Sequence, residues 1–172
     1  MLVANTRVDK ILIDTGASVN IIFLSVLKRM GLSERDIVQC RRANNIVAAF
    51  GANATPLGII TLPVTAGIAP KSSTVMADFS VLDDSFCLGY NIIFGIPGLN
   101  ALRAVPSTYH LLLRFPTEAG IGQVRGDQLQ AREYYKPRRQ LEQVRRQETQ
   151  NDARASVTLL GLIILLSNLL RF

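Results

Sequence analysis

Short apolar runs separated by turn residues fill the first part of the chain, from residue 1 to residue 124. Runs of four to eight aliphatic or aromatic residues, bounded by Gly, Pro, Asn and Ser, are typical of β-strands. The pattern predicts strands at residues 8–13, 19–23, 74–82 and 90–95. This part of the chain is therefore expected to be an all-β domain.

Two hairpins and one helix complete the expected elements. Residues 47–50 and 57–62 flank the turn-rich segment GANATP and predict a hairpin, and the runs HLLLRF and IGQVRG predict a second one. Leu24, Leu27 and Met30 are close to helical spacing and precede Gly31, which predicts a short helix over residues 24–32.

The composition changes twice along the chain and suggests three segments. Residues 1–124 carry ten Lys/Arg and eight Asp/Glu, whereas residues 125–154 carry eight basic and five acidic residues and almost no large aliphatic ones. The second segment predicts a solvated helix or a disordered linker. Residues 155–172 form an apolar tail, in which 155–170 have no charge.

The linker and the tail each leave an alternative open. Tyr134 and Tyr135 among arginines, with a net charge of +6, suggest nucleic acid. Interleaved acidic residues favour a solvated linker instead, so no nucleic-acid partner is expected. Residues 155–170 are shorter than the ~20 residues of a spanning helix; they are interpreted as a weak membrane anchor or a read-through tail, and the second interpretation is favoured.

Overall composition excludes several kinds of chemistry. With 172 residues and 48% hydrophobic residues, the chain can bury one sizeable core. Cys40 and Cys87 have no metal-binding spacing, and His110 is the single histidine, so neither a metal site nor a Ser-His or Cys-His pair is expected. Both thiols are expected to be reduced and inert, and His110 to be a structural residue within a strand. No signal peptide is recognised, and an intracellular, cytoplasmic protein is expected.

The segment ILIDTGASVNII, residues 11–22, places a carboxylate between an apolar run and a Gly-containing turn. Burial of an ionised carboxylate is costly without donors, so Asp14 is either a structural turn residue or a functional acid. Nucleotide sites of the sugar-kinase and actin type need two α/β lobes, and P-type phosphorylation needs Lys after the Asp, where Thr15 stands. The remaining chemistry is activation of water, for which two carboxylates that share one proton supply both a base and an acid.

IDTGAS, the distal IIFG and the segment YNIIFGIPGLNALRAVPSTYHLLLRFPTEAGIGQVRGDQ resemble the retropepsins, and more narrowly the gypsy-type LTR retrotransposon polyproteins of plants. The likeness covers roughly residues 3–135. It implies a retropepsin-like closed β-barrel with one short helix and a helical or disordered C-terminal extension, although the N-terminal strand is expected to be short. It also implies an aspartic endopeptidase that cleaves peptide or polyprotein substrates without a cofactor.

The resemblance assigns roles to the residues of the turn. Asp14 is implied to be the catalytic carboxylate, Thr15 to form a hydrogen bond across a dimer axis, and the Gly16 N–H to donate to the carboxylate. Ala17 and Ser18 are implied to contact substrate, Ser18 through the substrate backbone.

Further residues are implied from outside the turn. Ile93, Phe94 and Gly95 are implied to pack beneath it, with Ile93 also at the substrate. Residues 47–60 are implied to form a flap that closes over substrate. Phe50 and Gly51 lie in this flap and are expected to contact substrate, although Phe50 also fits a core aromatic role, as do Phe94 and Phe115.

The chain has one Asp-Thr-Gly, because Asp83-Asp84-Ser85 lacks the Thr-Gly turn. A site with two carboxylates therefore needs a homodimer in which two copies of Asp14 meet on the two-fold axis. The alternative is a decayed or domesticated domain that keeps the fold and serves as a dimeric interaction module. Ile96 stands where many retropepsins have a charged residue.

Overall fold

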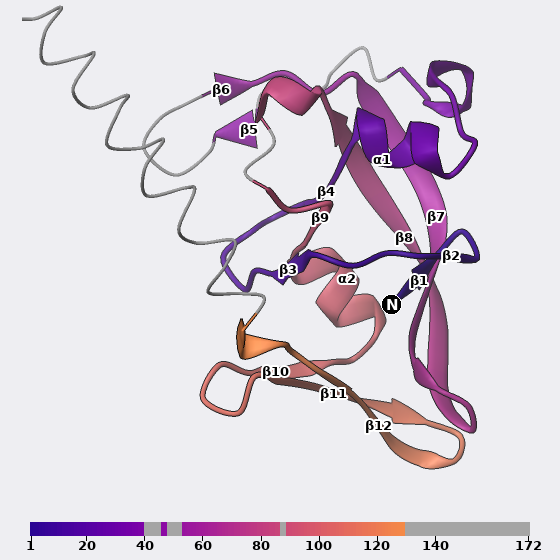
Figure 1. Ribbon diagram of the computed structural model, residues 1–172, viewed down its shortest axis with the longest axis vertical. Helices are drawn as coiled ribbons and strands as arrows, with labels where there is room; N and C mark the ends of the chain where they lie inside the picture. The colour runs from indigo at the N-terminus through magenta and orange to yellow at the C-terminus, as the bar shows by residue number, and fades with distance from the viewer. Residues whose placement is uncertain (40–45, 48–52, 87–88, 130–172) are drawn as a thin grey trace, which may run out of the picture. The chain divides into compact units, whose positions relative to one another are not determined.

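The computed structural model describes residues 1–39, 46–47, 53–86 and 89–129. The chain divides into two units, Met1–Gln128 and Leu129–Phe172. The fold described below is that of the first unit, drawn in colour in Figure 1. The linker and tail expected at residues 125–154 and 155–172 lie almost wholly outside the described residues, and so do Cys40, Cys87, Phe50 and Gly51.

A seven-stranded sheet with the order β2-β1-β7-β8-β4-β9-β3 forms the body of this unit. Its strands are β1 (Leu2–Val3), β2 (Thr6–Arg7), β3 (Ile11–Ile13), β4 (Asn20–Phe23), β7 (Gly58–Ile68), β8 (Lys71–Leu82) and β9 (Ile92–Phe94). A two-stranded sheet contains β5 (Ile46–Val47) and β6 (Asn53–Ala54), and a three-stranded sheet contains β10 (Val105–Ser107), β11 (Leu112–Thr117) and β12 (Gly120–Arg125). The helices are α1 (Leu24–Arg29) and α2 (Ile96–Ala101), with single 3-10 turns η1 (Glu34–Asp36) and η2 (Asp84–Phe86).

The seven-stranded sheet curls until its two edges approach each other. The edge strands β2 and β3 are consecutive in the chain and are joined by residues 8–10 alone, a link that spans at most ~3.5 Å per residue. The Val8 N–H donates to the Met1 carbonyl (3.0 Å), and the Asn91 N–H donates to the Lys10 carbonyl (2.9 Å), so the link is bonded to the residues that precede β1 and β9, the strands next to the two edges. This arrangement agrees with the expected retropepsin-like barrel.

The strands that flank the Asp-Thr-Gly turn, β3 and β4, lie on either side of β9 in the sheet. β3 lies parallel to β9, and β4 lies between β9 and β8, antiparallel to the first and parallel to the second. The turn that joins β3 to β4 must therefore pass over the end of β9. Ile92 and Phe94 of β9 point into the core, 0% and 1% exposed.

The long hairpin of β7 and β8 lies inside the seven-stranded sheet, between β1 and β4 (Figure 1). One face of β7 is buried through the alternating side chains of Ile60, Leu62, Val64 and Ala66. The opposite face carries cross-strand hydrogen bonds, such as Thr61 Oγ1 to Asp78 Oδ1 at 2.6 Å.

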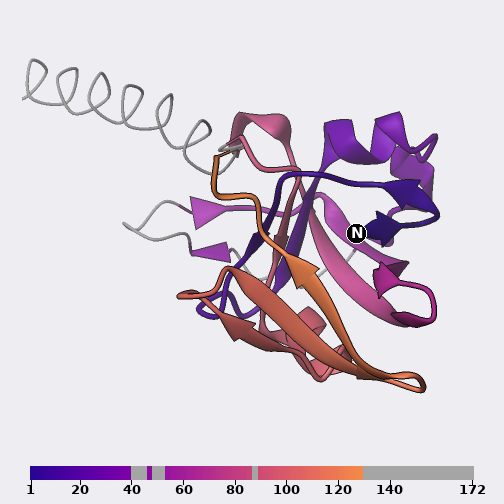
Figure 2. The same cartoon turned by 60° about the horizontal axis from the view of Figure 1, so that its bottom comes forward.

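The three-stranded sheet packs against the turn of this hairpin. Figure 2 brings it to the front. A Cβ atom on Gly122 of β12 would lie 2.5 Å from the Phe115 ring and 2.8 Å from the Lys71 carbonyl, so the absence of a side chain permits this close packing. Phe115 is buried together with Phe23, Phe79 and Phe94, as expected for Phe94 and Phe115.

Several predicted elements agree with the structure. Strands 19–23, 74–82 and 90–95 correspond to β4, β8 and β9, and the helix over 24–32 corresponds to α1. The predicted hairpin of HLLLRF and IGQVRG is formed by β11 and β12. Strand 8–13 is shortened to β3, because Lys10 has φ 58° and interrupts the extended backbone.

Other expectations were wrong. Of the hairpin predicted from residues 47–50 and 57–62, residues 48–50 lie outside the described residues. The described residues pair differently: residues 58–62 belong to β7, which pairs with β8 along its whole length, and Val47 of β5 pairs with Asn53 of β6. A second helix, α2, was not expected, since Pro97 and Gly98 indicate a turn. His110 is exposed and lies in the turn before β11 instead of a strand, and its Nδ1 lies 2.9 Å from Ser107 Oγ.

Candidate active site

The Asp-Thr-Gly turn connects β3 to β4 and presents polar groups at the surface. Asp14 is partly exposed, and Thr15, Gly16 and Ser18 are exposed. Ala17 is half-buried between them. One turn therefore brings together all five residues that the sequence analysis singled out between Asp14 and Ser18.

Two backbone N–H groups donate to Asp14, one of them to its carboxylate. The Gly16 N–H donates to Asp14 Oδ1 at 2.8 Å, and the Ala17 N–H donates to the Asp14 carbonyl at 3.4 Å. The Asp14 N–H donates to the Phe94 carbonyl at 3.0 Å, which extends the pairing of β3 with β9 up to the carboxylate-bearing residue. A carboxylate that accepts a backbone N–H is held in a fixed orientation.

The end of β9 supports the turn from beneath. The Ile96 N–H donates to the Ala17 carbonyl at 2.9 Å. A Cβ atom on Gly95 would lie 2.4 Å from the Val19 carbonyl oxygen and 2.6 Å from that of Ala17, so only glycine allows the two backbones to approach this closely. Ile93 and Phe94 precede Gly95, with Phe94 in the core and Ile93 half-buried.

The other predicted substrate contacts are Ile93 of β9 and two residues of the expected flap, Phe50 and Gly51. Ile93 of β9 is the register partner of Leu12, two residues before Asp14, so it lies beside the strand that leads into the turn. Phe50 and Gly51 lie outside the described residues, together with the other residues of 48–52 in the expected flap. Of the flap, β5 and β6 are described as a short antiparallel pair.

Sequence reasoning missed one residue at this site, Asn20. It is the first residue of β4 and is 2% exposed, the single buried polar side chain of the part of the chain that the structure describes. Its Oδ1 accepts the N–H groups of Gly95 (2.9 Å) and Gly98 (3.2 Å), and its Nδ2 donates to the Asp78 carbonyl (2.9 Å). The available signal was a polar residue at the start of an otherwise apolar strand, NIIF.

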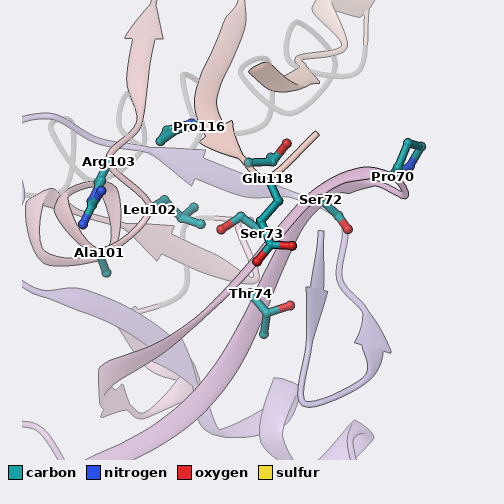
Figure 3. A pocket seen from close by; sticks show the side chains of 10 residues that line it. Pro70, Ser72, Ser73, Thr74, Ala101, Leu102, Arg103, Pro116 and Glu118 are labelled. Carbon is teal, nitrogen blue, oxygen red and sulfur yellow. The ribbon is translucent and has the colours of Figure 1, made fainter. Parts of the chain in front are cut away.

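A surface hollow lies elsewhere, between the turn of the β7–β8 hairpin, the end of α2 and the turn that joins β11 to β12 (Figure 3). None of the predicted site residues lines it. Its lining combines hydroxyl groups with one basic and one acidic residue: Pro70, Ser72, Ser73, Thr74, Ala101, Leu102, Arg103, Pro116, Thr117 and Glu118. This hollow therefore has no part in the chemistry of the turn.

Two further kinds of feature would be relevant to function in the described residues, a cluster of metal-binding side chains and a long apolar helix. Within those residues, no group of three or more His, Cys, Asp or Glu side chains is placed to hold a metal ion. None of the helices described is long and apolar enough to cross a bilayer.

Comparison with known proteins defines the class of fold. No protein-family model and no curated protein matches the chain. Among solved structures, the retroviral protease-like domain of Ddi1 from Leishmania major is similar, with a TM-score of 0.50 and 20% identity, over 73% of this chain and 91% of that one. The chain thus has a retropepsin-like fold, the fold of aspartic protease-like domains.

Proposed function

We propose that the protein is an aspartic endopeptidase that hydrolyses peptide bonds as a homodimer. The observation that carries the proposal is the Asp14-Thr15-Gly16 turn, with the Gly16 N–H on Asp14 Oδ1, at the β3–β4 crossing of a retropepsin-like fold. Retropepsin-like domains are typically dimeric, and one chain contributes one carboxylate to this turn. The second carboxylate would come from the other copy of Asp14.

The proposed reaction divides the proton transfers between the two carboxylates. The ionised carboxylate takes a proton from water as the water oxygen adds to the peptide carbonyl carbon, and the protonated one gives its proton to the carbonyl oxygen. The neutral gem-diol intermediate then collapses: one of its hydroxyl groups returns a proton to the carboxylate that protonated the carbonyl oxygen, the C–N bond breaks, and the amine nitrogen receives a proton from the carboxylate that took it from water. Thr15 would bond across the dimer axis, and Ala17, Ser18, Ile93, Phe50 and Gly51 would contact the substrate.

In its finer form, the proposal is that the substrate is the polyprotein of a gypsy-type retrotransposon and that cleavage takes place inside the cell. Its support is the sequence resemblance around IDTGAS and in residues 90–128. The second candidate function is a decayed copy that dimerises without cleaving. Ile96, at a position where many retropepsins have a charged residue, favours that candidate.

The replacement Asp14→Asn tests the mechanism. An amide keeps the shape of the carboxylate but cannot act as a base, so peptide cleavage should fall to the uncatalysed level. The dimer should be no weaker, since two facing carboxylates no longer repel each other. Cleavage of a peptide library at mildly acidic pH, its inhibition by pepstatin and sedimentation of the dimer measure these effects in the full chain.

The matched control is Glu118→Gln, which replaces an exposed carboxylate outside the Asp-Thr-Gly turn and should leave cleavage unchanged. Undiminished cleavage by the Asp14→Asn protein would exclude the aspartic-protease mechanism. An inactive wild-type dimer would support the decayed copy instead.

A further inference from the structure

Helix α2 begins without a capping side chain of its own. Its N-cap is Gly95, which has no side chain, and Pro97 at the second helical position has no N–H. The first N–H groups of a helix have no partner within the helix and need one from elsewhere. In α2 these partners must therefore come from another part of the chain.

The Asp-Thr-Gly segment supplies them. The Ile96 N–H donates to the Ala17 carbonyl, and the Gly98 N–H donates to Asn20 Oδ1, which also accepts the Gly95 N–H. The same amide donates through Nδ2 to the Asp78 carbonyl of β8, which fixes its orientation. Asn20 thus acts as the cap of a helix that lies more than 70 residues away in the chain, as the separations of 75 and 78 residues show.

The bonds between segments 14–20 and 94–98 form one connected set. Asp14 is bonded to Phe94 at the start of the turn, Ala17 to Ile96 in its middle, and Asn20 to Gly95 and Gly98 at its end. A displaced Asn20 amide would free the N–H of Gly95, a residue so close to the carbonyl groups of Ala17 and Val19 that a Cβ atom would not fit between them. The backbone that carries Asp14 and Gly16 would then lose its support from beneath.

We infer that Asn20 is a positioning residue for the Asp14 turn: its buried amide holds the turn to the N-terminus of α2 and thereby fixes the carboxylate. The catalytic part of this inference rests on the proposed function, whereas the coupling of turn and helix does not. Asn20 itself does not touch the reacting atoms. A merely local role would confine its effect to Gly95 and Gly98, the two donors that it binds.

Hydrogen exchange of single amides, measured by NMR on the full chain, separates the two roles. Asn20→Ala should speed the exchange of the Ile96 and Asp14 N–H groups by about tenfold or more, although neither is bonded to Asn20. The matched control is Leu113→Ala, which removes a buried side chain from the separate three-stranded sheet. The inference would be overturned if the exchange rates of the Ile96 and Asp14 amide protons rose no more in Asn20→Ala than in this control.

Cleavage provides the functional measurement. A displaced catalytic group costs rate more than affinity, so kcat of the Asn20→Ala dimer should fall by about 100-fold while KM changes little. Leu113→Ala should keep kcat per folded dimer. An unchanged kcat in an active Asn20→Ala protein would refute the positioning role.

The two proposals fail in different ways. If wild-type protein cleaves nothing, the proposed function fails, and the exchange of Ile96 and Asp14 alone decides the inference. If Asn20→Ala does not fold, Asn20→Ser decides it by the same exchange criterion, because the shorter hydroxyl cannot reach all three partners of the amide.

Discussion

At the residue scale, the candidate site depends on Gly95, because this residue has no side chain. The backbone of the β9–α2 junction passes so close to the turn that any side chain at this position would overlap the carbonyl oxygens of Val19 and Ala17. Phe94, the residue before Gly95, anchors the end of β9 in the core, because its side chain is only 1% exposed. The apolar-apolar-Gly pattern of the sequence is therefore a packing requirement at the base of the Asp14 turn.

Replacement of this glycine is expected to be costly. Gly95→Ala should reduce the free energy of unfolding by about 1–3 kcal/mol, the usual range for overpacking, and should lower cleavage further by displacing Ala17. Urea unfolding and the peptide assay measure the two effects. Gly126→Ala is the control, since a Cβ atom there would lie 3.3 Å from its nearest neighbour, the Leu111 carbonyl oxygen. Equal stability of the two variants would contradict the packing argument.

At the element scale, two short turns are stabilised by aspartate side chains. The Ser33 N–H donates to Asp36 Oδ2 at 2.8 Å at the start of η1, and the Ser85 N–H donates to Asp83 Oδ1 at 2.9 Å beside η2. These hydrogen bonds to the ionised form lower the pKa of both Asp36 and Asp83. Asp84 of η2 also accepts the Ser25 hydroxyl at 2.6 Å, which ties η2 to α1.

The lowered pKa values predict a loss of stability in acid. A carboxyl group whose pKa is lowered by folding stabilises the native state above its ordinary pKa, 3.8 for Asp36 and Asp83, and this contribution disappears as the pH falls through the folded pKa. The double variant Asp36→Asn, Asp83→Asn should therefore show a shallower decline of stability below about pH 4. Thermal unfolding between pH 2 and pH 6 measures it. A decline as steep as in the wild type would show that these hydrogen bonds do not contribute.

At the scale of the whole molecule, each chain carries one Asp-Thr-Gly turn, between β3 and β4 of the curled sheet. A protein with one such carboxylate per chain needs a second copy for the proposed reaction. Within the described residues the turn is exposed, with Thr15, Gly16 and Ser18 open to the surface. Among the described residues, the turn is therefore open to contact with a second copy.

The need for a second copy predicts that activity depends on concentration. On dilution below the dissociation constant of the dimer, cleavage per mole of protein should fall in proportion to the remaining dimer fraction. Progress curves over a dilution series, compared with sedimentation under the same conditions, measure this dependence. Specific activity that stays constant after the dimer has dissociated would exclude a shared site.

Local patterns in the sequence determined much of this protein. The apolar runs were sufficient for β4, β8, β9 and the hairpin of β11 and β12, because alternation and turn residues act over a few neighbouring positions. The segment IDTGAS identified the turn, since an Asp followed by Thr-Gly at the end of a strand leaves few chemical interpretations. The resemblance of the chain to retropepsins implied a fold that the structure has.

Only the tertiary structure decided the rest. β7 pairs with β8, and Val47 pairs with Asn53, a choice between partners that local patterns do not contain. Helix α2 includes Pro97 and Gly98, weak helix formers, and is stabilised by hydrogen bonds that its N–H groups donate to the Ala17 carbonyl and to Asn20 Oδ1. The importance of Asn20 could not be predicted for the same reason: the groups that its amide binds are 58, 75 and 78 residues away in the sequence and become neighbours only when β4 pairs with β8 and β9.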